Sequence, residues 1–244
     1  MLIDVHAHLH FPEIVNDIDN IIKRAKENDF KAILNSGTSL ESNKITLQLS
    51  KKYDLIKPSL GIYPTEISDL DKELNFIEEN KKEVYAIGEV GLDFKEAKNF
   101  EEQKKNFLRI IDLAEKIKKP ILIHSRKAEK EVLEILETSK IKNVILHCFS
   151  GKMKLVKKAI DLNYSFSIPA VIVRLEHFKK VVELLPTTKI LTESDAPFLS
   201  PYRGKFNEPS FIKETIKEIS TIKKLEQEEV EKIIYINFQK MFVK

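Results

Sequence analysis

Short apolar runs alternate with longer amphipathic stretches along the whole chain. The short runs are dense in Ile, Val and Leu, which is typical of strands buried on both faces of a parallel sheet. We expect eight such strands, at residues 2–5, 31–35, 55–61, 84–90, 120–123, 143–146, 164–168 and 189–191.

The stretches between these strands carry apolar residues at helical spacing. Phe107, Ile110, Ile111 and Ala114 form one such stripe, and two further helices are expected at residues 210–221 and 226–242. Eight alternating units in 244 residues predict a single α/β domain over residues 1–244, folded as a (β/α)8 TIM barrel, which needs about 250 residues. The alternative is a doubly wound open sheet, but no G-x-G-x-x-G or P-loop pattern is present.

Composition narrows the possible function classes. No apolar run reaches the roughly 18 residues of a membrane span, and 41 basic against 38 acidic side chains neither require nor exclude nucleic acid. The single Cys148 excludes an intrachain disulfide and favours a reducing compartment. The first residues enter a strand without a signal-peptide pattern. We therefore expect a cytoplasmic protein with no membrane contact, as a monomer or weak oligomer.

Six side chains that can bind metal lie at or near the ends of five predicted strands. The carboxyl ends of barrel strands share one rim, where barrel enzymes have their active sites. Imidazole and carboxylate groups together suit divalent ions such as zinc, manganese or magnesium. The pattern predicts a metal site built from His6, His8, Glu89, His124, His147 and Asp195.

The spacing of these residues supports convergence on the rim. His6 and His8 are two apart on one strand, so both can project from the same face. Glu89 lies among glycines, and its two carboxylate oxygens can bind two cations separately. His124 and His147 each end an apolar strand, and Asp195 follows the last strand. Taken singly, each histidine could instead be a packed or hydrogen-bonded residue, Glu89 a rim salt bridge and Asp195 an exposed turn residue.

Nearby polar residues carry further expectations. Asp4 and Glu193 point to the same face one layer deeper, where a carboxylate can orient a metal-binding histidine. His10 lies beyond the first strand and is expected to be exposed. Cys148 is interpreted as a small buried thiol. Helices are expected to open at residues 125–126 and 150–151.

Whole motifs match a known family. The stretches IDVHAHL, IGEVGLDF, ILIHSRKAEKEV, VILHCFSG, LTESDAPFLSP and RGKFNEPSF occur in this order from the first residues to the last third of the chain. They resemble the TatD family of metal-dependent deoxyribonucleases, within the amidohydrolase superfamily. The resemblance implies a metal-dependent hydrolase with two divalent ions. One ion would be held by His6, His8, Glu89 and Asp195, and the other by Glu89, His124 and His147.

Two positions depart from the family pattern. Tyr63 stands before Pro64 where the family usually has a histidine, which affects a loop expected to contact substrate. Residues 167–171 lack the expected glycine.

The net charge expected for the metal site favours an anionic substrate. Two divalent ions, two carboxylates (Glu89 and Asp195) and one hydroxide leave a net charge of +1, which suits a phosphodiester. We expect the catalytic residues Asp195 and Glu89 to support hydrolysis by metal-bound hydroxide, with Asp195 orienting the nucleophile and accepting its proton. The predicted activity is a TatD-like deoxyribonuclease of the 3'-5' exonuclease type, acting on single-stranded or damaged DNA in DNA repair or degradation.

Substrate contacts are expected from Tyr63, Arg126, Lys152 and Arg203, and Phe198 or Tyr202 could stack on an unpaired base. Alternatively, the basic residues are solvated rim charges and the aromatic residues only pack the loops. The alternative function is a deacylase or amidohydrolase acting on an ester or amide such as D-aminoacyl-tRNA, and a third is a non-enzymatic metal-binding scaffold.

Overall fold

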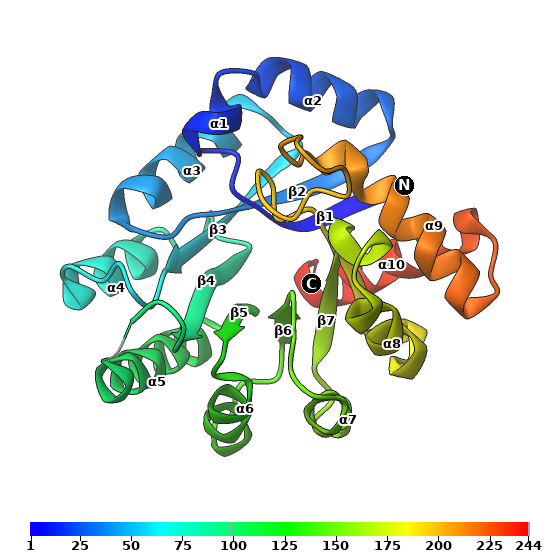
Figure 1. The fold of residues 1–244 in the computed structure, drawn as a ribbon. Coiled ribbons are helices and arrows are strands. Elements are labelled where there is room, and N and C mark those ends of the chain that lie inside the picture. The colour runs from blue at the N-terminus through cyan, green and yellow to red at the C-terminus, as the bar shows by residue number, and fades with distance from the viewer. Residues whose placement is uncertain (98, 244) are drawn as a thin grey trace.

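Eight parallel strands form one sheet whose neighbours follow the order of the sequence (Figure 1). The computed structural model describes residues 1–97 and 99–243. The strands are β1 (Leu2–Ala7), β2 (Phe30–Ser36), β3 (Ile56–Ile62), β4 (Ala86–Asp93), β5 (Ile121–Arg126), β6 (Val144–His147), β7 (Ser165–Pro169) and β8 (Ile190–Glu193). All eight expected strands are confirmed.

The sheet curls so that its last strand returns beside its first. The Asp195 backbone N–H donates to the His6 carbonyl at 2.9 Å, and the Thr192 hydroxyl donates to the Ile3 carbonyl at 2.6 Å. These contacts bring the ends of β8 and β1 together. The (β/α)8 barrel is confirmed, and the open doubly wound sheet is wrong.

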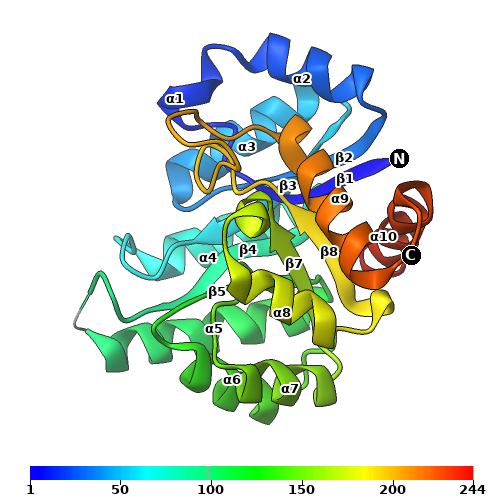
Figure 2. The same cartoon turned by 45° about the vertical axis from the view of Figure 1, so that its right-hand side comes forward.

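Helices surround the sheet on its outer face (Figures 1 and 2). The stripe of Phe107, Ile110, Ile111 and Ala114 is buried, as its spacing predicts. The helices are α1 (Pro12–Val15), α2 (Ile18–Glu27), α3 (Leu40–Lys52), α4 (Leu70–Glu79), α5 (Phe100–Ile117), α6 (Glu129–Thr138), α7 (Met153–Asp161), α8 (Glu176–Leu184), α9 (Ile212–Lys223) and α10 (Gln227–Phe242), with 3-10 turns η1 (Ala170–Val173), η2 (Thr187–Lys189) and η3 (Pro209–Phe211). Within the described ranges, none of them has the length and apolarity needed to cross a membrane.

The pairing of the strands becomes irregular where the candidate ligands begin. The register of β1 against β2 shifts between Asp4 and Ala7, and that of β4 against β5 shifts between Ile87 and Val90. Such irregularities redirect side chains near the carboxyl ends of strands. His6 and Glu89 lie inside the two shifted segments. Their side chains can therefore point in other directions than those of the regularly paired residues earlier in β1 and β4.

Two predicted helix starts are wrong. Strand β4 continues to Asp93 and pairs with β5 up to Arg126, so residues 125–126 extend a strand and α6 begins only at Glu129. Residues 150–151 lie in a loop, because α7 begins at Met153.

Candidate metal centre

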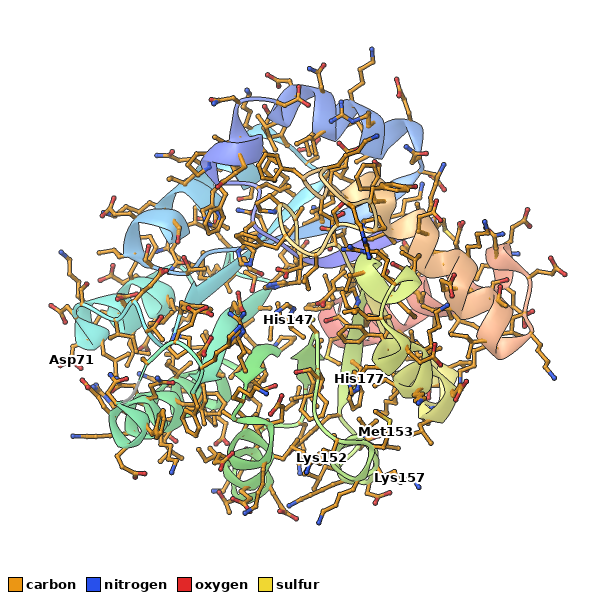
Figure 3. All side chains as sticks on the ribbon, in the orientation of Figure 1. Asp71, His147, Lys152, Met153, Lys157 and His177 are labelled. Atoms are coloured by element: carbon orange, nitrogen blue, oxygen red, sulfur yellow. The ribbon has the colours of Figure 1, made fainter. Side chains whose placement is uncertain are left out.

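The six candidate ligands converge at the carboxyl ends of five strands. Their donor atoms form three overlapping groups, within each of which the atoms lie within 4.8 Å of one another. Figure 3 shows His147 near the middle of the barrel, as convergence requires. The groups are His6, His8 and Glu89; His6, His147 and Asp195; and Glu89, His124 and His147.

Glu89 directs its two oxygens to different pairs of histidines. Its Oε2 lies 3.5 Å from His6 Nε2 and 3.3 Å from His8 Nε2. Its Oε1 lies 2.6 Å from His124 Nδ1 and 3.6 Å from His147 Nε2. One carboxylate therefore faces two donor sets at once, the arrangement that a ligand shared by two ions requires.

Asp195 completes the set on the β1 side. Its Oδ1 lies 3.4 Å from His6 Nε2 and 3.5 Å from His8 Nε2. Its backbone N–H donates to the His6 carbonyl at 2.9 Å, which fixes the backbone of the aspartate beside that of the histidine it faces. With Glu89 Oε2, these atoms form one half of the centre.

The separations fit an ion between the ligands better than direct hydrogen bonds. His6 Nε2 is buried and has no hydrogen-bond partner. Two ligands bound at about 2.1 Å to one tetrahedral zinc ion lie about 3.4 Å apart. The Nε2–carboxylate distances around His6 and His8 are close to this value, so this donor set fits a divalent ion.

On the side of the centre formed by His6 and His8, the imidazoles contact a neutral residue, Ser36. The Ser36 hydroxyl lies 3.0 Å from His6 Nδ1, and His8 Nδ1–H donates to the Ser36 carbonyl at 2.8 Å. The bond of His8 leaves its Nε2 free to bind a cation. Asp4 does not orient an imidazole: it accepts hydrogen bonds from the backbone of His6 and from Ser194, because it lies one layer below the rings.

On the side formed by His124 and His147, the imidazoles contact carboxylates. His147 Nδ1 lies 2.9 Å from Glu193 Oε2, which matches the orienting role expected of Glu193. His124 Nε2 lies 3.1 Å from Asp93 Oδ2 and 3.3 Å from the Tyr63 hydroxyl. Tyr63 donates to the same Asp93 oxygen at 3.0 Å.

The ionisable groups of the centre are strongly coupled. Burial alone would lower the pKa of His6 and His8, but the facing carboxylates of Asp195 and Glu89 raise it to about 9. Burial would likewise lower the pKa of the other two imidazoles, His124 and His147, but Glu89, Asp93 and Glu193 raise it to about 9. Without an ion, protonated imidazoles balance the charge of the carboxylates, and a bound cation would displace these protons.

The charge of the centre differs from the value counted on the ligands alone. The count on the ligands includes only the carboxylates of Glu89 and Asp195, but the carboxylates of Asp93 and Glu193 lie directly behind two of the histidines. The sequence count omitted Asp93 and Glu193, whose contact with the ligands depends on the fold. With these two carboxylates beside the ligands, the surroundings of the centre carry more negative charge than the count on the ligands alone includes.

The centre opens into a cavity of about 900 Å³. Tyr63 and Arg126 line this cavity, as expected of substrate contacts, and so does Phe198. Lys152 and Arg203 are exposed and do not line it, and Figure 3 shows Lys152 beside α7 in the outer ring.

Three further residues differ from their expected surroundings. His10 is half-buried against Phe11, with ring centroids 4.8 Å apart, so its predicted exposure is wrong. Cys148 is half-buried in the cavity wall and not in the core. Tyr202 lies outside the cavity lining, where its hydroxyl donates to Glu214 at 3.0 Å.

The sequence interpretation missed several residues of the site, among them Ser36, Asp93, Arg174 and His177. Ser36 and Asp93 touch the histidines, and Arg174 and His177 line the cavity. Asp93 ends a strand four residues after Glu89, which is a readable signal, but no local pattern distinguishes Ser36 or Arg174 from ordinary loop residues.

Comparison with known proteins agrees with this architecture. The family model described as TatD related DNase matches residues 3–243. A protein from Methanocaldococcus jannaschii named uncharacterized metal-dependent hydrolase MJ1582 is 37% identical, over 98% of this chain and 96% of its own. Human deoxyribonuclease TATDN3 is 32% identical, over 100% of this chain and 95% of its own.

Solved structures show the same fold. The crystal structure of YJJV, a TatD homologue from Escherichia coli, superimposes with a TM-score of 0.91 at 23% identity and covers 99% of this chain and 97% of its own. Dihydroorotase from Campylobacter jejuni gives a TM-score of 0.67 at 16% identity, covering 99% of this chain and 82% of its own. With a family match over nearly its whole length, the chain belongs to the TatD-related DNase family of metal-dependent hydrolases.

Proposed function

We propose that this protein is a deoxyribonuclease that uses two divalent ions to cleave phosphodiester bonds of single-stranded or damaged DNA, as a 3'-5' exonuclease. The observation that carries the proposal is the position of Glu89, whose two oxygens face separate donor sets. A relative with 32% identity bears the name deoxyribonuclease, which supports the choice of substrate.

The proposed ligand sets follow the two halves of the centre. His6, His8, Asp195 and Glu89 Oε2 would hold one ion, and His124, His147 and Glu89 Oε1 the other. Zinc, manganese and magnesium are the candidate ions. When bound, such ions polarise phosphoryl oxygens and lower the pKa of coordinated water from 15.7 to about 7.

Asp195 is the proposed proton acceptor. Despite burial, the imidazoles of His6 and His8 that face it hold the pKa of Asp195 below its ordinary range, so it is ionised at neutral pH. Its backbone bond to the His6 carbonyl keeps the carboxylate turned towards the cavity that it lines. Asp195 is therefore placed to orient an attacking water and to receive its proton, while Glu89 holds the two halves together.

The direct test is hydrolysis by the purified protein. With magnesium, manganese or zinc, it should release nucleotides from the 3' end of single-stranded DNA, and EDTA should abolish the reaction. Asp195→Asn should retain the circular dichroism spectrum and lose at least about 10³-fold in kcat. Absence of cleavage of any phosphodiester with every metal would refute the nuclease, and release from the 5' end would refute only the polarity.

A second candidate is ester hydrolysis on a substrate such as D-aminoacyl-tRNA. Tyr63 favours it, because its hydroxyl donates to Asp93 and is not free as a phosphate donor in place of the usual histidine. Release of free D-amino acid from charged tRNA, without cleavage of DNA, would select this candidate. Tight metal binding without turnover of either ester would select the scaffold.

The compartment and the oligomeric state stay predictions. A cytoplasmic location agrees with the single cysteine, and a monomer or weak oligomer is expected. Cell fractionation and size-exclusion chromatography with light scattering test these two predictions directly.

A further inference from the structure

Two arginines lie at the rim of the cavity, and their partners differ. Arg126 Nη1 donates to Glu96 Oε1 at 2.6 Å, so its charge is compensated. Arg174, which follows η1 after β7, donates from Nη2 to the Ser200 carbonyl at 2.6 Å. Within residues 1–97 and 99–243, it forms no ion pair with a carboxylate. Of the two arginines that line the cavity, Arg174 is therefore the one whose positive charge no carboxylate balances within the described ranges.

The bond to Ser200 holds the Arg174 guanidinium in place without occupying it. Ser200 is buried and belongs to the long connection after β8, so Arg174 spans the β7 and β8 connections. One of its five N–H groups is used in this bond. The others remain able to form a forked pair with phosphate oxygens, at less entropic cost than a free side chain would pay.

Charge around the cavity favours the Arg174 side for an anionic chain. Glu66 and Glu96 follow β3 and β4 on the opposite side of the barrel, where they would repel phosphates (Figures 1 and 2). Apart from Asp195 of the metal centre, Glu176 is the lining carboxylate on the Arg174 side, and Phe198 lies in the β8 connection with Ser200. Within the described ranges, Arg174 is the guanidinium of the cavity lining that has no carboxylate partner, so it attracts an anion to this side of the cavity.

We propose that Arg174 binds a backbone phosphate of the nucleic-acid substrate and directs the strand along the β7–β8 side of the cavity, beside the exposed ring of Phe198. This inference rests on the proposed action on nucleic acid and adds a binding residue to it. Arg126 contributes less, because a phosphate must compete with Glu96 for its guanidinium.

Arg174→Met tests the proposal, with Arg109→Met as the matched control. Arg109 is an exposed arginine of α5 paired with Asp71, outside the cavity lining. Affinity for a fluorescein-labelled single-stranded oligodeoxynucleotide is measured by anisotropy in EDTA, where hydrolysis does not interfere. Arg174→Met should weaken binding about 10- to 100-fold and reduce the slope of log Kd against log salt by about 1.

Kinetics separate binding from general damage. For Arg174→Met we expect KM on the oligonucleotide to rise more than kcat falls, whereas Arg109→Met should leave both unchanged. Arg126→Met should weaken binding less than Arg174→Met, and Arg174→Lys should restore part of the affinity because the point charge remains.

Equal affinity and equal salt slope for Arg174→Met and Arg109→Met would overturn the inference. Failure of the wild-type protein to cleave DNA would refute the nuclease alone, since the anisotropy measurement reads Arg174 without turnover.

Discussion

The two halves of the metal centre present similar ligands to the cavity but rest on different partners. The half with His6 and His8 is backed by the hydroxyl and the carbonyl of Ser36, which are neutral. The half with His124 and His147 is backed by the carboxylates of Asp93 and Glu193. Carboxylate partners raise the basicity of a metal-binding imidazole. The ligands alone therefore do not show how each half of the centre would control its affinity for an ion.

The largest effect should come from the residue that both halves share. Glu89→Gln replaces each carboxylate oxygen with an uncharged group, so both ions should bind more weakly and kcat should fall by at least about 10³-fold. Isothermal titration with manganese gives the stoichiometry. Retention of one ion at wild-type affinity would show that Glu89 serves one half only.

Lower pH should weaken metal binding in both halves. All four imidazoles have a pKa of about 9 without metal, so a cation must displace protons throughout the range below this value. Affinity should fall about tenfold per pH unit for each proton displaced. Titrations between pH 6 and pH 9 measure this slope, and an affinity independent of pH would contradict the coupling.

Asp93→Asn should separate the halves. The affinity for the ion held by His124 and His147 should fall about 10- to 100-fold, while the affinity for the other ion should not change. Ser36→Ala should have a smaller effect on its own half, because His8 bonds to the carbonyl of Ser36 and only His6 loses a side-chain partner.

Equal weakening of both ions by Asp93→Asn would break this comparison. Asp93 also accepts hydrogen bonds from the backbone N–H groups of Lys95 and Glu96, so circular dichroism is needed to check that the variant is folded.

The smallest effect is expected for Tyr63→Phe. This variant removes only the hydroxyl that contacts Asp93 and His124 and leaves Asp93 bonded to the histidine. We expect about a 3-fold loss of affinity in the half with His124, because one of its two partners remains. A loss as large as that of Asp93→Asn would identify Tyr63, and not Asp93, as the main partner.

Much of the fold could be predicted because its signals are local. The dense apolar runs mark β1 to β8, and the stripe of α5 marks the helix that covers β4. Predictions failed where pairing extends an element: β5 reaches Arg126 because β4 continues beside it to Asp93. No periodicity within residues 121–126 contains that information.

The sequence by itself determined which six side chains reach the rim, because strand periodicity and the position of each residue at a strand end are properties of short segments. Only the tertiary structure decided which residues contact these six side chains and which arginine lines the cavity without a carboxylate partner. Ser36 comes from β2, Asp93 from the extended end of β4, and Arg174 is held by a carbonyl of the β8 connection. These contacts join residues far apart in sequence, and they depend on register and loop path, which arise only when the barrel closes.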